Sequence, residues 1–144
     1  MKIYVCGGSS ELDAVKERMR QLREMGHEIT HDWTATVSAV GDANPRTATH
    51  KQRVRWSGED LLGVEEASIV WVMLPTKPSF GCAFEMGFAV GTGHAVIVSG
   101  DWRASIFSSQ AEHRFDEHDH ASEWLRLYGT PGSWEAEMAE LEAV

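Results

Sequence analysis

The sequence predicts an α/β protein in which a parallel five-stranded sheet is covered by helices on both faces. Short apolar runs alternate with stretches of helical periodicity along most of the chain, a pattern typical of parallel sheets with helical crossovers. Two of these runs, residues 71–74 and 95–98, are continuously apolar, as expected for strands that are buried on both faces. We expect the strand order 2-1-3-4-5 of flavodoxin-like and Rossmann-like proteins, in one doubly wound domain that spans residues 1–144.

The first strand is predicted at residues 2–6, and a glycine-rich turn leads from it into a helix. Leucine, valine and methionine side chains recur at helical spacing between Leu12 and Met25, which gives this helix one buried face. Ser10 and Asp13 match the S-x-x-D form of a capping box. Gly26 is a typical helix stop.

The next segment is predicted to hold a strand, a long loop and a helix. Residues 28–33 form the expected second strand, and the small and polar residues 34–49 form the loop. Loops of this length are usually functional or mobile in compact domains. Residues 51–66 form the expected helix. Its expected inward-facing side chains are Val54, Leu61, Leu62 and Val64.

The middle of the chain reads as a strand, a loop, a helix and another strand. Pro75, Pro78 and Gly81 end the strand at residues 71–74, and residues 80–90 form the expected helix. Beyond residue 100 the pattern weakens. There we expect a turn-like stretch at 105–109, a fifth strand at 113–115, and helices at 120–128 and 131–141.

The composition indicates a soluble globular protein and excludes several classes of partner. The formal net charge of −9 argues against a broad nucleic-acid surface. No apolar run approaches the roughly 20 residues of a membrane span, and the first residues read as a strand rather than a signal peptide. With only two cysteines, Cys6 and Cys82, we expect reduced thiols and a cytoplasmic protein.

One carboxylate interrupts the most apolar predicted helix. Glu85 lies within residues 82–88, which are otherwise apolar or glycine, and a charge there must face a cleft or find a partner. Ser79 and Gly81 lie just before it at the predicted helix N-terminus, where free N–H groups can hold an anion. The alternative is a glutamate stabilised by the helix dipole, but its apolar neighbours favour a functional role.

Two further residues are predicted near the same place. In such sheets ligands bind outside the carboxyl ends of strands one and three, where Tyr4 lies and where the helix carrying Asp60 leads. Alone, Asp60 reads as an exposed helix carboxylate and Tyr4 as a core aromatic. Two carboxylates and a phenol in one crevice suit glycosidic chemistry, with one carboxylate as the nucleophile and the other as the acid.

Three segments of the chain resemble the nucleoside 2-deoxyribosyltransferase superfamily. They are I-Y-V-C-G-G-S at residues 3–9, D-L-L-G-V-E-E-A-S-I-V at 60–70, and P-S-F-G-C-A-F-E-M-G-F-A at 78–89. The third is the most specific, because the P-S-x-G-x-x-x-E-x-G-x-A spacing is held throughout. Within the superfamily the chain is most similar to the 2′-deoxynucleoside 5′-phosphate N-glycosidases and related CMP-type glycosidases, over roughly residues 2–100.

The resemblance implies a role for each matching residue. Glu85 becomes the nucleophile that forms a glycosyl-enzyme intermediate, Tyr4 positions it, and Asp60 serves the leaving base as acid or hydrogen-bond partner. The implied donors to a 5′-phosphate are Gly7, Gly8, Ser9, Ser79 and Gly81. The resemblance also implies a homodimer or higher homo-oligomer, in which a serine of the neighbouring subunit, Ser108 or Ser109, completes the phosphate site.

Departures from the family pattern leave the substrate open. Transferases that act on free nucleosides usually carry an aspartate at the place of Ser79, so this serine favours a nucleotide. The glycosidase turn usually holds a serine at Gly8 and a basic residue soon after, whereas this chain has Glu11. The leading hypothesis is cleavage of the N-glycosidic bond of a (deoxy)nucleoside 5′-monophosphate. The alternatives are transfer of deoxyribose to a second base, and a protein that binds a nucleotide signal without turnover.

Other candidate sites are less favoured. His113, His118 and His120 lie among acidic residues, but their spacing matches no standard metal site, so we expect no metal and no cofactor. Cys6 lies between a strand and a helix, as reactive thiols often do, but the sequence shows no base beside it. G-G-S-S is not the G-x-G-x-x-G of a dinucleotide site. Trp33 flanks the long loop, where it can stack on a base or pack in the core.

Overall fold

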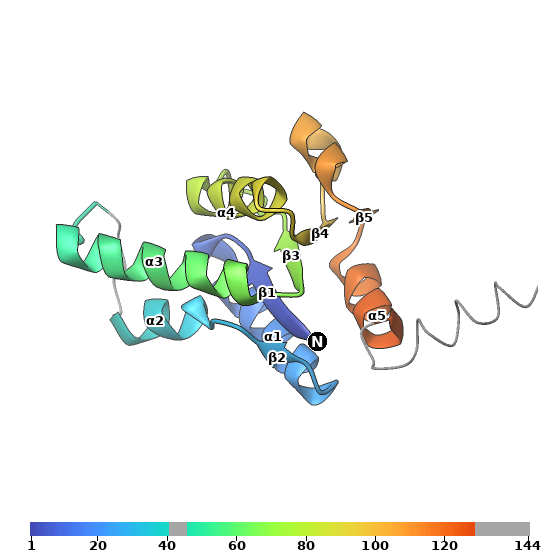
Figure 1. The fold of residues 1–144 in the computed structure, drawn as a ribbon, viewed down its shortest axis with the longest axis horizontal. Helices are drawn as coiled ribbons and strands as arrows, with labels where there is room; N and C mark the ends of the chain where they lie inside the picture. The colour runs from blue at the N-terminus through green and yellow to red at the C-terminus, as the bar shows by residue number, and fades with distance from the viewer. Residues whose placement is uncertain (41–45, 129–144) are drawn as a thin grey trace, which may run out of the picture.

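The computed structural model describes residues 1–40 and 46–128 and is built around a five-stranded sheet (Figure 1). Its strands are β1 (Lys2–Cys6), β2 (Glu28–Ile29), β3 (Ile69–Met73), β4 (Ala95–Ser99) and β5 (His113–Phe115). Neighbouring strands pair in parallel in the order β2-β1-β3-β4-β5. The predicted fold class and strand order are therefore confirmed. The helix expected at residues 131–141 lies outside the described residues.

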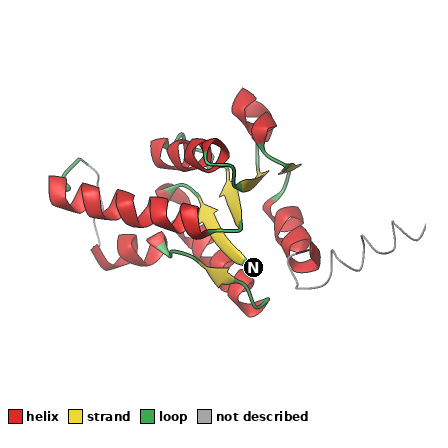
Figure 2. Cartoon of the chain, in the orientation of Figure 1, coloured by secondary structure: helices red, strands yellow, loops and turns green. Residues whose placement is uncertain are grey.

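Helices cover both faces of this sheet (Figure 2). The α-helices are α1 (Leu12–Glu24), α2 (Trp33–Val40), α3 (His50–Glu66), α4 (Phe80–Gly91) and α5 (His118–Tyr128). Three 3-10 helices are η1 (Ser9–Glu11), η2 (Trp102–Ala104) and η3 (Ile106–Gln110). Helix α1 packs against α2 and α5, and α3 packs against α4 on the opposite face. None of the helices in the described part of the chain combines the length and the apolar character needed to cross a membrane.

The two faces of the central strands carry different chemistry. Successive side chains of a strand point to opposite faces, and Tyr4 on β1 points toward α3 and α4. On β3, Trp71 points the other way, and its indole N–H donates to Ser99 Oγ at 2.8 Å. Ser99 Oγ is in turn 2.6 Å from His118 Nδ1. The face under α1 and α5 thus contains a buried polar chain that joins the sheet to α5, while the face under α3 and α4 contains the candidate site.

The segment after α1 differs most from the prediction. The strand β2 pairs over only two residues, and Trp33, predicted to lie in it, begins α2. Asp32 stabilises this helix start, because its carboxylate accepts a hydrogen bond of 3.2 Å from the N–H of Ala35. The Trp33 indole donates to the Val5 carbonyl at 2.8 Å and is buried. The loop prediction is therefore wrong for residues 34–40, and Trp33 is a core side chain.

The start of α1 also differs from the prediction. Ser10 and Asp13 form no capping box, because η1 precedes the helix and the residue at its N-cap, Glu11, makes no side-chain cap. The capping box of this fold lies on α3 instead. There Thr49 accepts from the N–H of Gln52, and the Gln52 side chain accepts from the N–H of Thr49.

The inward face of α3 is smaller than predicted. Val64 is fully buried, but Val54 and Leu62 are 58% and 53% exposed. The N-terminal half of α3 projects beyond the sheet (Figure 1), so Val54 has no strand beneath it. The prediction that Val54 and Leu62 face inward is therefore wrong, and only the last turns of α3 pack on β1.

Candidate active site

Glu85 lies in the second turn of α4 and is 9% exposed. Its Oε1 accepts a hydrogen bond of 3.0 Å from the hydroxyl of Tyr4. Burial and the Glu85 charge raise the pKa of Tyr4 above its usual value, so the phenol stays a donor. Ser79 begins α4 by accepting a hydrogen bond of 3.2 Å from the N–H of Cys82. The cap and the phenol together fix where the carboxylate lies.

Cys6 lies beside Glu85, and the two groups influence each other's pKa. Cys6 is fully buried, and burial raises the pKa of its thiol well above the usual value, with the Glu85 charge raising it further. The sequence shows no base beside this cysteine, whereas the structure places a carboxylate there. That carboxylate opposes formation of a thiolate, which is the nucleophilic form of cysteine. Cys6 therefore remains a poor nucleophile, for a reason different from the one the sequence indicates.

Asp60 of α3 reaches the same pocket as Glu85. This pocket lies between α3 and α4 and has a volume of about 250 Å³. It is lined by Ser57, Asp60, Leu61, Gly81, Phe84 and Glu85. The packing of α3 against α4 thus brings together two carboxylates from separate motifs, with the Tyr4 hydroxyl bonded to one of them. We call this cavity between α3 and α4 the carboxylate pocket.

Burial raises the pKa values of both carboxyl groups. It raises the pKa of Glu85 to about 7, and the charge of Asp60 adds to this effect, while the hydrogen bond from Tyr4 and the neighbouring Cys6 thiol lower it. Burial also raises the pKa of Asp60 to about 6, where His31 lowers it and Glu59 raises it. The two groups therefore titrate together near neutral pH. Such a pair can supply one ionised and one protonated carboxyl group to the same substrate.

Gly63 lets two side chains approach α3 closely. A Cβ atom at Gly63 would lie 2.9 Å from Cδ2 of Tyr4 and 2.7 Å from Cβ of His31, distances too short for carbon atoms that are not bonded. The hydroxyl of Thr30 donates to the Gly63 carbonyl at 2.6 Å. The end of β2, the strand β1 and the helix α3 are thus in contact one helical turn beyond Asp60.

The loops that follow β1 and β3 are joined to each other. The Glu11 carboxylate accepts hydrogen bonds from the backbone N–H of Thr76, at 2.9 Å, and from its hydroxyl. A Cβ atom at Gly8 would lie 2.8 Å from Cβ of Pro75, and one at Gly7 would lie 2.5 Å from a methyl group of α1. Both glycines therefore allow close packing of the turn. The negative charge of Glu11 is used to hold the two loops together.

The other residues expected at a phosphate lie in different places. Gly81 lines the carboxylate pocket, whereas the half-buried Ser79 lines the other side of α4. Ser9 is exposed in η1. Ser109 is also exposed, and its hydroxyl donates to the Ile106 carbonyl at 2.7 Å. Ser109 does not line the carboxylate pocket of its own chain.

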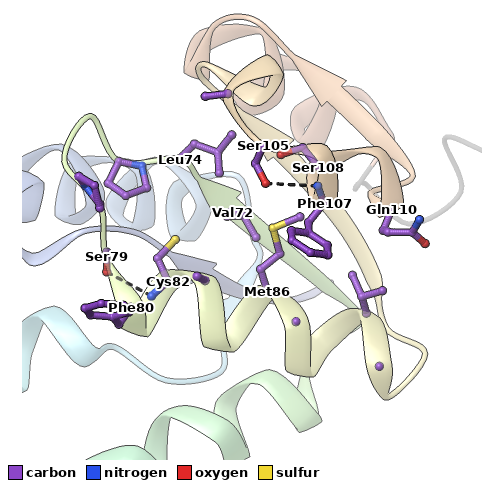
Figure 3. A pocket seen from close by; sticks show the side chains of 17 residues that line it. Val72, Leu74, Ser79, Phe80, Cys82, Met86, Ser105, Phe107, Ser108 and Gln110 are labelled. Carbon is purple, nitrogen blue, oxygen red and sulfur yellow. Dashed lines mark hydrogen bonds between the residues drawn. The ribbon is translucent and has the colours of Figure 1, made fainter.

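A larger hollow, the apolar groove, lies between the other side of α4 and residues 104–110 (Figure 3). Its volume is about 830 Å³, and no carboxylate, amine or imidazole lines it among the described residues. Figure 3 shows Cys82 and Met86 of α4 facing Phe107 across it. Ser108 is fully buried at this groove, and its hydroxyl has no hydrogen-bond partner among the described residues.

His113 and His118 make separate contacts in the structure. His118 contacts Ser99, while the ring of His113 packs against Trp124 with centroids 4.9 Å apart. Within residues 1–40 and 46–128, no three side chains of the ligating types lie close enough to hold a metal ion. These histidines therefore have structural contacts with the sheet and with α5.

His31 is the residue of the site that the sequence analysis missed. Its Nε2 lies 3.3 Å from Oδ1 of Asp60. A single histidine after a short strand belongs to no motif, so no local pattern identifies it. The usable signal is the strand order, because it places the end of β2 beside the end of β1.

Comparisons with known proteins agree on the fold. No model of a protein family matches the chain, and no curated protein matches it in sequence. Among solved structures, a 2-deoxyribosyltransferase from the psychrotolerant bacterium Bacillus psychrosaccharolyticus is 17% identical, with a TM-score of 0.66 over 85% of this chain and 90% of that chain. The CMP N-glycosidase BcmB of Clostridium botulinum is 13% identical, with a TM-score of 0.54 over 89% and 100% of the two chains. At these identities the likeness shows that all three proteins share one flavodoxin-like α/β fold.

Proposed function

We propose that this protein cleaves the N-glycosidic bond of a (deoxy)nucleoside 5′-monophosphate through a glycosyl-enzyme intermediate on Glu85. The ionised carboxylate attacks C1′, the bond from C1′ to the base breaks, and its electron pair leaves with the base, which takes a proton from Asp60. Water then attacks C1′ and gives a proton to the Asp60 carboxylate, the bond from C1′ to Glu85 breaks, and the sugar phosphate leaves with both carboxyl groups restored. Tyr4 holds the nucleophile in place during both steps.

The observation that carries this proposal is the buried hydrogen bond of 3.0 Å between Tyr4 and Glu85, next to a pocket that Asp60 also lines. A donor on one carboxylate oxygen fixes the direction of the other, which favours attack from one side. Low exposure increases the basicity of the carboxylate. The motif around Glu85, and the fold shared with a 2-deoxyribosyltransferase and a CMP N-glycosidase, support the same chemistry.

The mechanism needs Glu85 ionised and Asp60 protonated at the same moment. The ionised fraction of Glu85 grows as pH rises through about 7, and the protonated fraction of Asp60 declines as pH rises through about 6. Their product is largest between these values. We therefore expect a bell-shaped dependence of kcat/KM on pH. Both breaks belong to the coupled pair, with Asp60 contributing most to the lower one and Glu85 most to the upper one. A rate that keeps rising above pH 8 would contradict these roles.

The 5′-phosphate is assigned to the start of α4, with Ser79 and Gly81, and to the turn at residues 7–9. Free N–H groups in the first turn of a helix attract anions, and the Ser79 hydroxyl can donate while its oxygen caps the helix. The Glu11 carboxylate in the neighbouring turn repels a second anion. Comparing kcat/KM for each nucleoside monophosphate with kcat/KM for its free nucleoside measures whether the donors or the Glu11 charge has the larger effect. We expect a modest preference for the monophosphate.

Following free base in a panel of ribo- and deoxyribonucleoside monophosphates tests the proposed reaction. We expect release from at least one of them, and its loss in Glu85→Gln. The control is Glu66→Gln at the exposed end of α3, which should keep the activity. Release from no nucleotide, or undiminished release by Glu85→Gln, would overturn the proposal.

A second candidate is transfer of the sugar to another base. The fold similarity to a 2-deoxyribosyltransferase favours it, since both reactions share the intermediate on Glu85. Adding a second base to the assay separates them, because transfer yields a new nucleoside or nucleotide and hydrolysis yields the free sugar phosphate.

We also propose that the active form is a homodimer in which the partner subunit's Ser109 completes the phosphate site. The apolar groove supports this, because Phe80, Ile106 and Phe107 beside it are 98%, 82% and 69% exposed and large apolar patches usually mark contacts between chains. Mixing Glu85→Gln with Ser109→Ala is the test. A serine acting across the interface restores up to about a quarter of the sites, whereas a serine acting within its own chain restores none.

A further inference from the structure

His31 lies at the end of β2, next to the carboxylate pocket. Its Nε2 is 3.3 Å from Oδ1 of Asp60, and the two side chains are 23% and 29% exposed. Charged pairs in full contact with water contribute little, but this pair is mostly sheltered from water. The imidazole also belongs to a different element from Asp60, so the contact depends on how β2 and α3 pack.

That packing is well defined. The residue before the imidazole, Thr30, donates from its backbone N–H to the Ile3 carbonyl at 3.0 Å and from its hydroxyl to the Gly63 carbonyl at 2.6 Å. These bonds tie it to both β1 and α3. The missing side chain of Gly63 then lets Cβ of His31 pack against the helix. The contacts that hold the Tyr4 ring against α3 therefore also hold the imidazole beside Asp60.

Several titratable groups surround Asp60. They are His31 from the link between β2 and α2, Glu59 on its own helix, Glu85 from α4, and Tyr4 and Cys6 from β1. Of these, His31 lowers the pKa of Asp60, and Glu59 raises it in the same direction as burial. Removing the imidazole therefore leaves Asp60 in surroundings that disfavour its charge.

We propose that His31 is a positioning residue that directs the Asp60 carboxyl group toward the leaving base and adjusts its acidity. This role rests on the proposed function, in which Asp60 gives a proton to the base. The imidazole acts through Asp60 rather than on the substrate. After the transfer it stabilises the carboxylate that remains, as outer partners of catalytic groups commonly do.

The test compares His31→Gln and His31→Leu with the wild type, and uses His50→Gln at the exposed start of α3 as the matched control. Both His31 variants should move the lower break of the kcat/KM profile to higher pH. We expect kcat to fall about 3–30-fold with little change in KM. Gln, which keeps a donor, should retain more activity than Leu, and His50→Gln should match the wild type.

A titration without substrate separates this inference from the proposed function. Carbon-13 NMR of labelled aspartate carboxyl groups should show Asp60 titrating at higher pH in His31→Gln than in the wild type. If the wild type releases no base, the proposed function fails and this titration still decides the coupling. If base is released but neither the titration nor the lower break moves, His31 has no such role.

Discussion

The two sides of α4 differ in size and in chemistry. Toward α3 the helix borders the carboxylate pocket of about 250 Å³, with Glu85 and Asp60 in its lining. Toward η3 it borders the apolar groove of about 830 Å³, which has no carboxylate among its described lining residues. The larger hollow of the two is therefore not the one that holds the ionisable side chains. A carboxylate becomes reactive where water is scarce and a donor is fixed, whereas a large apolar hollow suits contact with another chain.

The largest effect is expected from Glu85→Gln, which changes only the side of α4 that borders the carboxylate pocket. A glutamine cannot form the glycosyl ester, so kcat/KM for base release should fall by at least about 10³-fold. Steady-state release of base measures this, and circular dichroism checks that the fold is kept. A decrease of only a few fold would mean that the reactive group lies elsewhere.

Tyr4→Phe tests whether a fixed donor makes the pocket reactive. The ring still packs against Gly63, but the hydrogen bond to Glu85 is lost, and we expect kcat/KM to fall by about 10–100-fold. Because this bond lowers the pKa of Glu85, its loss should move the upper break of the pH profile to higher pH. If the upper break does not move, the Tyr4 hydroxyl does not control the ionisation of Glu85.

The pH dependence of the free energy of unfolding should show how unfavourable the buried charge of Glu85 is. The pKa of Glu85 is raised from 4.5 to about 7, so the folded protein binds the proton more tightly than the unfolded chain. Stability present at low pH is therefore lost as pH rises from about 4.5 to about 7. Glu85→Gln escapes this loss, and its free energy of unfolding should exceed that of the wild type by about 1–3 kcal/mol at pH 8.

Urea unfolding at pH 4.5 and pH 8 measures this difference. The wild type and Glu85→Gln should be nearly equal at the lower pH, where both side chains are neutral. A variant that is less stable at pH 8 would show that the ionised carboxylate is well solvated in the folded protein.

The smallest effect is expected on the other side of α4, from Ser108→Ala. The hydroxyl is buried without a partner among the described residues, and removing such a group is close to neutral or stabilising by up to about 1 kcal/mol. Urea unfolding at low protein concentration measures this. A loss greater than about 1 kcal/mol would show that the hydroxyl has a partner in solution, which would make the groove less apolar than its lining indicates.

Most of the fold is predictable from the sequence because its central elements depend on local patterns. The continuous apolar runs of β3 and β4 mark strands that are covered on both faces, and the regular spacing of α1 marks its buried face. Three buried side chains, Val15, Met19 and Leu22, confirm that spacing. Parallel strands linked by helices then allow few arrangements of the sheet.

The region from β2 to α3 is not predictable in this way, because its structure depends on distant contacts. Five of the eight residues of α2 are threonine, valine or serine, whose helix propensity is lower than that of alanine. They are helical here because Asp32 caps the start and the Trp33 indole bonds to β1. On α3, the exposure of Val54 follows from the helix extending past the sheet, which no periodicity reveals.

The candidate site likewise contains residues that local patterns predict and one that depends on distant contacts. Glu85 stands out in the sequence because a charge within an apolar helix is costly unless it has a hydrogen-bond partner or faces a cleft. Tyr4 and Asp60 follow from the motifs that resemble a known superfamily. His31 does not, since its contact with Asp60 depends on two elements meeting at a glycine.

The hydrogen bonds between Glu11 and Thr76 help to define which side of the carboxylate pocket is open. They join the loops after β1 and β3, and Pro75 occupies the space next to Gly8. The open side of the carboxylate pocket is therefore the seam between α3 and α4, where Phe84 is 65% exposed. In the proposed reaction, substrate would arrive and the free base would depart through this seam. Under that proposal, the rate of base release would depend on the packing of α3 against α4 rather than on the loops after β1 and β3.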